Sequence, residues 1–394
     1  MDHPDTEDQA LRRALVAEKH AQATALLSAH GLDCWLTFSR EGSDLLLPFV
    51  MGGEELVGTS ALMLFADGPP VAIVADYDVG QVEDHFETVL PYSLDWEGPL
   101  RDVLAERKPE RIGINFSEHD HGADGLTHGL FLALVDALEP IGLAEALVSS
   151  EPVAAAVRAI KTPAELERMR RACEMTIRIF DDVSGMLKPG LTEAEIAGIF
   201  RERMQTYEVG PAWEASYCPT VFSSNSAGGH HAPGTSRIER GDGVRVDFGV
   251  RSEGYCSDLQ RTWYLLGSGE TAPPAAFLRA FDAVHDGIRI AAETLRPGVS
   301  GQAVDAAARD LLASRGYTFT HALGHQVGRL AHDGGLLLGP NNARYGARSG
   351  GLVEPGMVFT LEPCVGPIGL EENVVVTETG CEFLVEPQDE VYLV

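Results

Sequence analysis

The stretch VRVDFGVRSEGYCSDLQRTW, residues 244–263, places two aspartates on either side of a predicted turn. A hairpin loop centred between Ser252 and Glu253 would pair residues whose numbers sum to 505. Asp247 and Asp258 meet this condition, so they are expected to be direct cross-strand neighbours, with Cβ atoms roughly 5 Å apart. Two carboxylates at that distance repel each other by about 3 kcal/mol at an effective dielectric constant of about 20. A positive charge is therefore needed beside them.

A second hairpin with the same pattern is predicted in GMVFTLEPCVGPIGLEENVVVTETG, residues 356–380. The numbers of Glu362 and Glu371 sum to 733, which centres the turn on the Gly-Pro dipeptide between them and again places two carboxylates opposite each other. Arg261 or Arg245 could neutralise one such pair. Four clustered carboxylates, however, indicate divalent metal ions, which prefer oxygen ligands.

Histidines in glycine-rich loops supply the remaining type of ligand. The segment FTHALGHQVGRLAHDGG, residues 319–335, carries His325 and His332 among four glycines, which let the backbone lie close to the groups that these side chains contact. Upstream, the turn-rich motif HHAPG supplies His230 and His231. A lone histidine is often structural, but the two predicted carboxylate pairs make these residues candidates for a metal or substrate site.

The chain is expected to form two domains, because 394 residues exceed what one ordinary core organises. Residues 1–153 alternate between helical and β-rich segments and predict a smaller α/β domain. Residues 154–394 begin with a helix that Thr162 caps. In this second domain LKPGLTEAEI (187–196) resembles LRPGVSGQAV (295–304), which indicates two related halves. The chain as a whole is assigned to the α+β class.

The composition limits the partners and the compartment. The 59 acidic and 30 basic residues give a formal charge of −29, which repels nucleic acid and anionic membrane surfaces. No apolar run approaches the roughly 20 residues of a membrane-spanning helix. The start, MDHPDTEDQA, lacks the apolar core of a signal peptide, and the six cysteines contain no CxxC pair. We therefore expect a cytoplasmic protein with a small or zwitterionic partner.

The motifs HHAPG, VDFG followed by SDLQRT, HALGHQVGRLAHD, MVFTLEP and LEENVVVTETG occur in an order that resembles the pita-bread metallopeptidases. These include prolidase, Xaa-Pro aminopeptidase and methionine aminopeptidase. The similarity runs from about residue 155 to the end, and the preceding part resembles the N-terminal domain of prolidase, aminopeptidase P and creatinase. The resemblance implies a C-terminal pita-bread (creatinase/aminopeptidase) fold with pseudo-twofold halves.

The resemblance also implies two divalent metal ions and a role for each candidate residue. Asp247 would chelate one metal, and His325 and Glu362 would hold the other. Asp258 and Glu371 would bridge the two. A water or hydroxide between the metals would attack the scissile carbonyl, and Glu362 would accept its proton. Manganese is favoured, with zinc, cobalt or iron as alternatives.

His230 and His332 would contact the substrate in such a site and stabilise the tetrahedral intermediate or the scissile amide. Two positions depart from the pattern of many relatives, which carry arginine and aspartate where this chain has Gly369 and Glu372. The missing arginine affects how the carboxylate of a dipeptide is anchored. Arg329 is a candidate to replace it.

The predicted function is hydrolysis of Xaa-Pro bonds, with an Xaa-Pro dipeptidase favoured over an Xaa-Pro aminopeptidase acting on longer peptides. A bond that precedes proline has a nitrogen without N–H, so the departure of that nitrogen depends on proton delivery. A creatinase-like small-amide hydrolase is the next alternative, but creatinase works without metal and this chain carries every predicted ligand. The last alternative is an inactive binding protein of the same fold, and such proteins usually lose ligands. A homodimer is the expected assembly.

Overall fold

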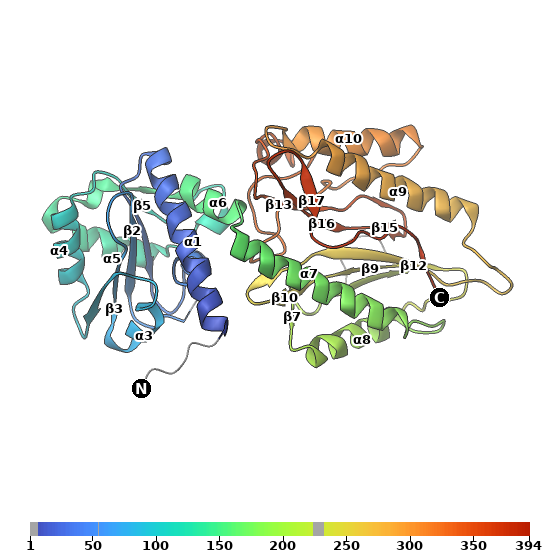
Figure 1. Ribbon diagram of the computed structural model, residues 1–394, viewed down its shortest axis with the longest axis horizontal. Helices are drawn as coiled ribbons and strands as arrows, with labels where there is room; N and C mark the ends of the chain where they lie inside the picture. The colour runs from blue at the N-terminus through green and yellow to red at the C-terminus, as the bar shows by residue number, and fades with distance from the viewer. Residues whose placement is uncertain (1–6, 54, 224–231) are drawn as a thin grey trace. The chain divides into compact units, whose positions relative to one another are not determined.

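Residues 7–53, 55–223 and 232–394 are described by the computed structural model shown in Figure 1. By its internal packing the chain divides into two compact units, Met1–Arg158 and Ala159–Val394. Within the described ranges, no helix is both long enough and apolar enough to cross a membrane.

The N-terminal unit is a mixed β-sheet with helices packed on both of its faces (Figure 1). The strand order is β4-β3-β2-β1-β5-β6. The pairs β1/β2 and β2/β3 are antiparallel, and the other pairs are parallel. The strands are β1 Cys34–Ser39, β2 Ser60–Phe65, β3 Val71–Ala75, β4 Thr88–Tyr92, β5 Ile112–Ile114 and β6 Leu147–Ser149. The α-helices are α1 Glu7–His30, α2 Leu47–Met51, α3 Val79–Val82, α4 Glu97–Arg107, α5 His128–Leu138 and α6 Glu151–Ala159.

The alternation of side chains along β1 explains why two helical layers are present. Trp35 lies in a buried cluster with Leu27 of α1 and Val153 of α6. The next residue, Leu36, lies in a separate cluster with Leu104 of α4. Because successive strand residues face opposite sides of a sheet, a fully buried strand such as β1 requires cover on both faces. The predicted α/β character of this part of the chain is confirmed.

The C-terminal unit combines short sheets with two pairs of long helices. Its largest sheet has four strands in the order β18-β12-β9-β8. The sheets β13-β16-β17 and β11-β10-β7 have three strands each, and β14 pairs with β15. In Figure 1, α7 and α8 lie on one side of these strands, and α9 and α10 lie on the other. The helices are α7 Pro163–Ser184, α8 Glu193–Thr206, α9 Ala275–Thr294, α10 Gly301–Ser314 and α11 Gly346–Ser349. The strands are β7 Gly210–Pro211, β8 Thr220–Ser223, β9 Gly243–Phe248, β10 Val250–Ser252, β11 Tyr255–Cys256, β12 Leu259–Tyr264, β13 Val358–Leu361, β14 Cys364–Val365, β15 Ile368–Gly369, β16 Glu372–Val376, β17 Cys381–Phe383 and β18 Tyr392–Leu393.

Two matched turns relate the halves of this unit. Gly190 precedes α8 and Gly298 precedes α10, and their φ angles are 95° and 81°. Gly190 N–H donates to the Ile238 carbonyl at 2.8 Å, and Gly298 N–H donates to the Val353 carbonyl at 2.9 Å. Glycine adopts such positive φ angles without steric cost, so both Pro-Gly motifs form the same turn for the same reason. The predicted relation between the halves, and with it the α+β class, is confirmed.

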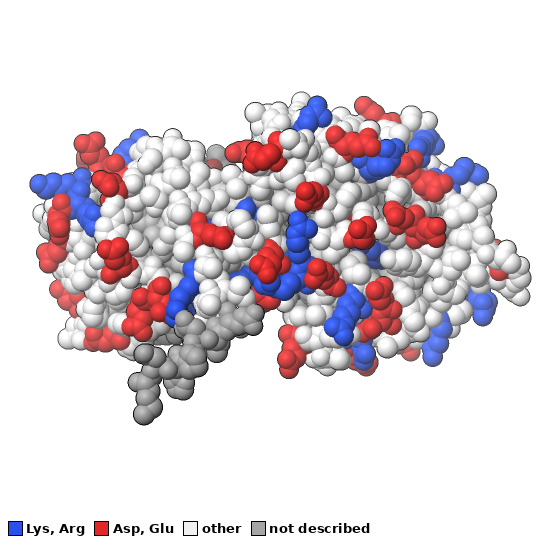
Figure 2. Space-filling view, in the orientation of Figure 1, with Lys and Arg blue, Asp and Glu red and all other residues white. Residues whose placement is uncertain are grey.

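Charged side chains of both signs are spread over the surface in view in Figure 2. Asp and Glu side chains are interspersed there with Lys and Arg side chains. On this face, the excess of carboxylates behind the net charge of −29 is therefore distributed rather than gathered in one patch. This arrangement is typical of a well-solvated protein surface.

Candidate metal centre

The hairpin that contains β9 and β12 differs in register from the prediction. Asp247 lies opposite Gln260, so the residue numbers of each facing pair add up to 507 rather than the predicted 505. The turn explains the difference, because Ser252 pairs with Tyr255 and leaves the two-residue loop 253–254. Both loop residues have positive φ, 50° and 80°, as in the two-residue turns whose twist matches that of the strands. The predicted direct pairing of the two aspartates is wrong.

The two aspartates nevertheless share one face of this hairpin. Side chains alternate along a strand, so a shift of two residues leaves the set of residues on each face unchanged. Asp258 precedes Gln260 by two residues and is therefore a diagonal neighbour of Asp247. The charge of Asp247 accordingly helps to raise the pKa of the Asp258 carboxyl, after burial and the charge of Glu371.

Asn373 of β16 acts as the backbone partner of Asp258. Its Oδ1 accepts the Asp258 N–H at 3.0 Å, and its Nδ2 donates to the Asp258 carbonyl at 2.9 Å. Gly249 packs directly against the backbone of Ser257, the residue before Asp258. A Cβ at position 249 would lie 2.0 Å from the Ser257 carbonyl oxygen. These contacts hold the backbone of Asp258 and thereby orient its carboxylate.

The second hairpin has the predicted register. The residue numbers of each facing pair add up to 733, both between β13 and β16 and between β14 and β15. The turn contains Gly366, whose φ is 58°, and the proline that follows it. Glu362 follows β13 and Glu371 precedes β16, so the two residues occupy facing positions. The prediction of this register is confirmed.

The two hairpins meet at Gln260 and Glu371. These residues exchange both backbone hydrogen bonds, at 3.2 and 3.3 Å. In addition, Gln260 Nε2 donates to Glu371 Oε2 at 2.8 Å. This junction brings the carboxylates of one hairpin beside those of the other.

His325 approaches the carboxylates from a loop that runs beside β13. Its N–H donates to Thr360 Oγ1 at 3.1 Å, and its carbonyl accepts the Thr360 N–H at 2.9 Å. The preceding Gly324 permits this approach, because a Cβ there would lie 1.9 Å from the Thr360 carbonyl oxygen. The imidazole Nδ1 lies 3.2 Å from the Gln326 carbonyl oxygen. This contact favours a proton on Nδ1 and leaves the lone pair of Nε2 facing the carboxylates.

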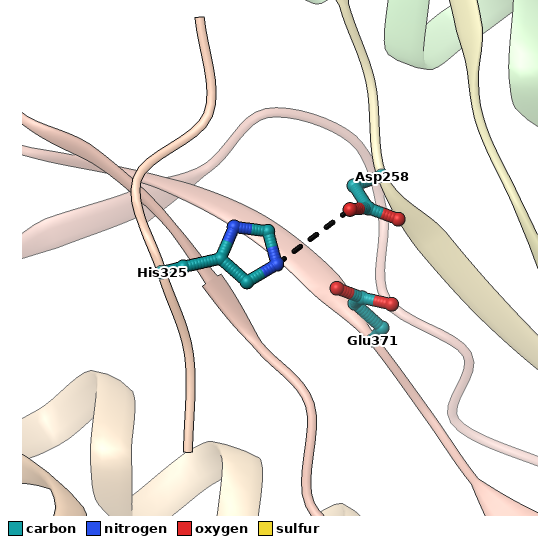
Figure 3. Close-up of side chains that lie close together, drawn as sticks. All are labelled: Asp258, His325 and Glu371. Carbon is teal, nitrogen blue, oxygen red and sulfur yellow. Dashed lines mark ion pairs between the residues drawn. The ribbon is translucent and has the colours of Figure 1, made fainter. Parts of the chain in front are cut away.

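Asp258, His325 and Glu371 form a group that can hold a metal ion. One ligand atom from each residue lies within 4.8 Å of the other two. Figure 3 shows the three side chains pointing toward one another from separate segments of the chain. His325 Nε2 lies 3.7 Å from Asp258 Oδ2 and 3.5 Å from Glu362 Oε1. Glu371 Oε1 is buried and has no hydrogen-bond donor in the described part of the chain, which suits a cation ligand.

Burial and mutual repulsion raise the pKa values of three carboxyls in this cluster, those of Asp258, Glu362 and Glu371, well above their ordinary range. Burial is the largest cause in each case, and the charge of a neighbouring carboxylate comes second. Asp247 contributes to all three shifts. Divalent cations would stabilise the charged forms instead. The donor set of four carboxylates and one imidazole therefore fits such ions.

The other predicted site residues lie at different places. The exposed His332 ring packs against the ring of His325, with 4.2 Å between centroids and 40° between planes. Arg329 lies near the tip of the first hairpin, where its guanidinium carbon is 5.3 Å from the centroid of the Tyr255 ring. His230 lies outside the described residues.

The two arginines considered as counter-ions make other contacts. Arg261 donates from two nitrogens to the two carboxylate oxygens of Glu372, at 2.9 and 3.1 Å. Arg245 stacks on Phe222, with its guanidinium carbon 3.9 Å from the ring centroid. Among the described residues, neither arginine forms an ion pair with the four clustered carboxylates. These contacts do not support the arginine alternative, and the metal ligands stay a prediction.

Sequence reasoning missed the polar residues that hold the ligands, namely Gln260, Thr360 and Asn373. A signal for two of them existed, because Gln260 and Asn373 each follow a predicted ligand by two residues and share its strand face. It also missed Cys364, whose Sγ lies 3.2 Å from His321 Nε2. Burial raises the pKa of this thiol, but the histidine hydrogen bond and a nearby arginine charge bring it down to about 7.

Three comparisons place the chain among known proteins. The uncharacterized peptidase YqhT of Bacillus subtilis (strain 168) is 27% identical over 280 residues, which cover 69% of this chain and 71% of that protein. The X-Pro aminopeptidase from Thermotoga maritima MSB8 is 24% identical, with a TM-score of 0.75 over 92% of this chain and 98% of that chain. An Xaa-Pro dipeptidase from Bacillus anthracis is 21% identical, with a TM-score of 0.75 over 96% of this chain and 100% of that chain. The two solved structures share the fold of this chain.

A family match covers the candidate metal centre. Residues 167–378 match metallopeptidase family M24. This range exceeds half of the 394 residues and contains all five predicted metal ligands. Because the match, the fold and the convergent ligands agree, the chain belongs to metallopeptidase family M24.

Proposed function

We propose that this protein is a metal-dependent peptidase that hydrolyses Xaa-Pro bonds, with Xaa-Pro dipeptides as its favoured substrates. The observation that carries the proposal is the convergence of Asp258, His325 and Glu371 within 4.8 Å in a chain of family M24. Two solved structures with this fold are named as an X-Pro aminopeptidase and an Xaa-Pro dipeptidase, which supports this substrate class.

Two divalent cations suit the charge of the cluster, since four carboxylates balance two doubly charged ions. The residues that would hold them are Asp247, Asp258, His325, Glu362 and Glu371. Mn²⁺ is favoured because four of these five side chains offer oxygen, and Zn²⁺ and Co²⁺ are the alternatives. When bound, the cations would supply Lewis acidity toward the scissile carbonyl and lower the pKa of water.

Glu362 is the carboxylate best placed to move a proton. Its side chain is 21% exposed, whereas that of Asp258 is 6% exposed and Glu371 is buried. A carboxylate that solvent reaches can exchange a proton with a nearby water, as a general base must. We assign to Glu362 the acceptance of the proton from the attacking water and its delivery to the proline nitrogen.

His332 is proposed to contact the substrate, because its exposed ring packs on the ligand His325 at the edge of the cluster. An imidazole at this position can donate a hydrogen bond to the carbonyl oxygen as negative charge develops on it. His230 is proposed for the same role on the sequence resemblance alone. A substrate-binding role for Arg329 also stays a prediction.

Metal content and substrate choice test this function together. Metal per chain is measured by elemental analysis, and hydrolysis of Ala-Pro, Ala-Pro-Ala and Ala-Ala is followed with and without added Mn²⁺. Cleavage confined to Ala-Pro supports the dipeptidase, and a preference for Ala-Pro-Ala selects the aminopeptidase instead. Metal binding without turnover of any of these peptides contradicts the proposal and favours a small-amide hydrolase or an inactive binding protein.

A further inference from the structure

A buried arginine lies on the same sheet face as the metal ligands. Arg245 precedes Asp247 by two residues on β9, so both side chains project from one face. In the sheet Arg245 is paired with Phe222 of β8 and Thr262 of β12. The adjacent same-face row contains Asp247 and Gln260. Arg245 is 9% exposed.

The Arg245 side chain is held between an aromatic ring and a backbone segment. Its guanidinium carbon lies 3.9 Å from the centroid of the Phe222 ring. Gly369 comes so close that a Cβ there would lie 2.5 Å from Arg245 Cδ and 2.7 Å from Nη1. Thr262 holds this glycine, because its Oγ1 donates to the Gly369 carbonyl at 2.7 Å and accepts the Gly369 N–H at 3.3 Å. The guanidinium is therefore preorganised by its packing.

The positive charge of Arg245 lies near the metal centre but forms no ion pair with a carboxylate of the described residues, and its Nε has no acceptor there. Its charge lowers the pKa values of Glu362 and Glu371 against the larger effect of burial. By contrast, Arg261 of the neighbouring strand is paired through two nitrogens with Glu372. Arg245 is hydrogen-bonded to the Cys364 thiol rather than to a carboxylate. A buried cation without a carboxylate partner is costly, so an anionic ligand is expected.

We propose that Arg245 is a specificity residue whose guanidinium binds a carboxylate group of the peptide substrate. This inference rests on the proposed peptidase function and assigns one part of its substrate site. When two divalent cations balance the four clustered carboxylates, the positive charge of Arg245 is not neutralised by them and can attract an anionic group of the ligand. A guanidinium offers two parallel N–H donors that match the geometry of a carboxylate. That carboxylate is either the C-terminus of a dipeptide or an acidic side chain.

The Cys364 thiol is the rival partner for this charge. Arg245 lowers the pKa of the Cys364 thiol through its charge and through a side-chain hydrogen bond, and Cys364 Sγ lies 3.2 Å from His321 Nε2. If the Cys364 thiolate neutralised Arg245, the arginine would have a structural role and would not bind the substrate. Cys364→Ser, which removes the acidity and keeps the size, separates the two roles.

Matched peptide pairs separate the two sources of the carboxylate. The kcat/KM of the metal-loaded protein is compared for Ala-Pro against Ala-Pro-amide, and for Glu-Pro-amide against Ala-Pro-amide. In one of these pairs we expect the peptide with the additional carboxylate to be preferred roughly 10- to 100-fold. Arg245→Gln should remove this preference mainly through KM. Cys364→Ser and the control Arg240→Gln, at an exposed arginine, should keep it.

Gly369→Ala tests the same side chain without altering its charge. The added Cβ would lie 2.5 Å from Arg245 Cδ and 2.9 Å from Gln260 Oε1, so the arginine side chain must move. We expect this variant to lose the carboxylate preference as Arg245→Gln does. A metal content equal to that of the wild type, measured by elemental analysis, would show that this loss does not come from a shift of Gln260.

Several outcomes overturn the proposal. Equal losses of kcat/KM on both members of a pair in folded Arg245→Gln protein would show a structural role, and a wild-type protein without preference in either pair would show no subsite. If the wild type cleaves no peptide, the proposed function fails. Calorimetric titration of the metal-loaded protein then tests separately whether Arg245 binds a carboxylate. Stronger binding of L-proline than of L-prolinamide, abolished in Arg245→Gln, supports the subsite, whereas equal binding contradicts it.

Discussion

Gln260 and Glu371, which are 111 positions apart in the chain, exchange both of their backbone hydrogen bonds, at 3.2 and 3.3 Å. A side-chain hydrogen bond of 2.8 Å from Gln260 Nε2 to Glu371 Oε2 adds to them. The pair joins the hairpin of β9 and β12 to that of β13 and β16. The alignment of the predicted metal ligands therefore depends on a residue that is not itself one of them.

Gln260→Leu should weaken metal binding without unfolding the protein. The substitution leaves the backbone hydrogen bonds in place and removes the donor to Glu371 Oε2. Because donors to metal-binding carboxylates typically contribute roughly 10- to 100-fold to affinity, we expect a loss of that size for Mn²⁺ in calorimetric titrations. Gln302→Leu, which loses only a 3.4 Å bond to the Gly346 carbonyl, is the matched control. Equal affinities in the two variants would contradict this role of Gln260.

Gly324→Ala should displace His325 and reduce metal content. The new Cβ would lie 1.9 Å from the Thr360 carbonyl oxygen, a clash that only backbone movement relieves. We expect a loss of about 1–3 kcal/mol in the free energy of unfolding by urea. Gly198→Ala in α8, where a Cβ meets nothing within 4 Å, should instead raise this free energy by up to about 1 kcal/mol. A full metal content in Gly324→Ala would contradict the role of Gly324 in placing His325 at the predicted metal site.

Glu372→Gln should destabilise the protein strongly, because it leaves the Arg261 charge buried without its partner. Both side chains of this ion pair are 1% exposed, and breaking such a pair costs about 3–5 kcal/mol in the free energy of unfolding. The control is Glu293→Gln in the exposed pair with Arg289, whose side chains are 54% and 57% exposed. Its effect should stay within about 0.5 kcal/mol. Urea unfolding of both variants measures the contrast.

The raised pKa values of Asp258, Glu362 and Glu371 predict how pH affects the metal-free protein. A carboxyl whose pKa is higher in the folded than in the unfolded chain holds its proton more tightly when folded. Its stabilising contribution is complete below the unfolded pKa of about 4 and is lost as pH rises through the folded pKa. In EDTA, the Tm of the wild type should therefore decline toward neutral pH more steeply than that of Glu371→Gln.

Added Mn²⁺ should oppose this decline, because binding to the folded state alone stabilises it. Near neutral pH the ion is expected to raise the Tm of the wild type more than that of Glu371→Gln, which lacks one charged ligand. Parallel Tm curves for the two proteins in EDTA between about pH 5 and 7 would argue against the carboxylate cluster.

The two hairpins illustrate what a sequence can predict about register. In the second hairpin the dipeptide of Gly366 and Pro367 marks one turn position, and the predicted pairing sum of 733 is correct. In the first hairpin, Glu253 adopts a positive φ of 50° beside Gly254, which moves the turn and changes the sum to 507. Positive φ is uncommon for a glutamate, so the sequence did not reveal this choice. The face of each aspartate was still predicted, because strand alternation survives a shift of two residues.

The sequence by itself determined the α+β class, the two related halves of the C-terminal unit and the strand faces on which the carboxylates lie. These features follow from local properties, namely the alternation of side chains along strands and the turns that particular residues favour. Only the tertiary structure decided that Gln260 meets Glu371 and that Arg245 lies against Gly369. Such contacts join segments more than a hundred residues apart, and their relative positions depend on the packing of the whole unit, which no local pattern specifies.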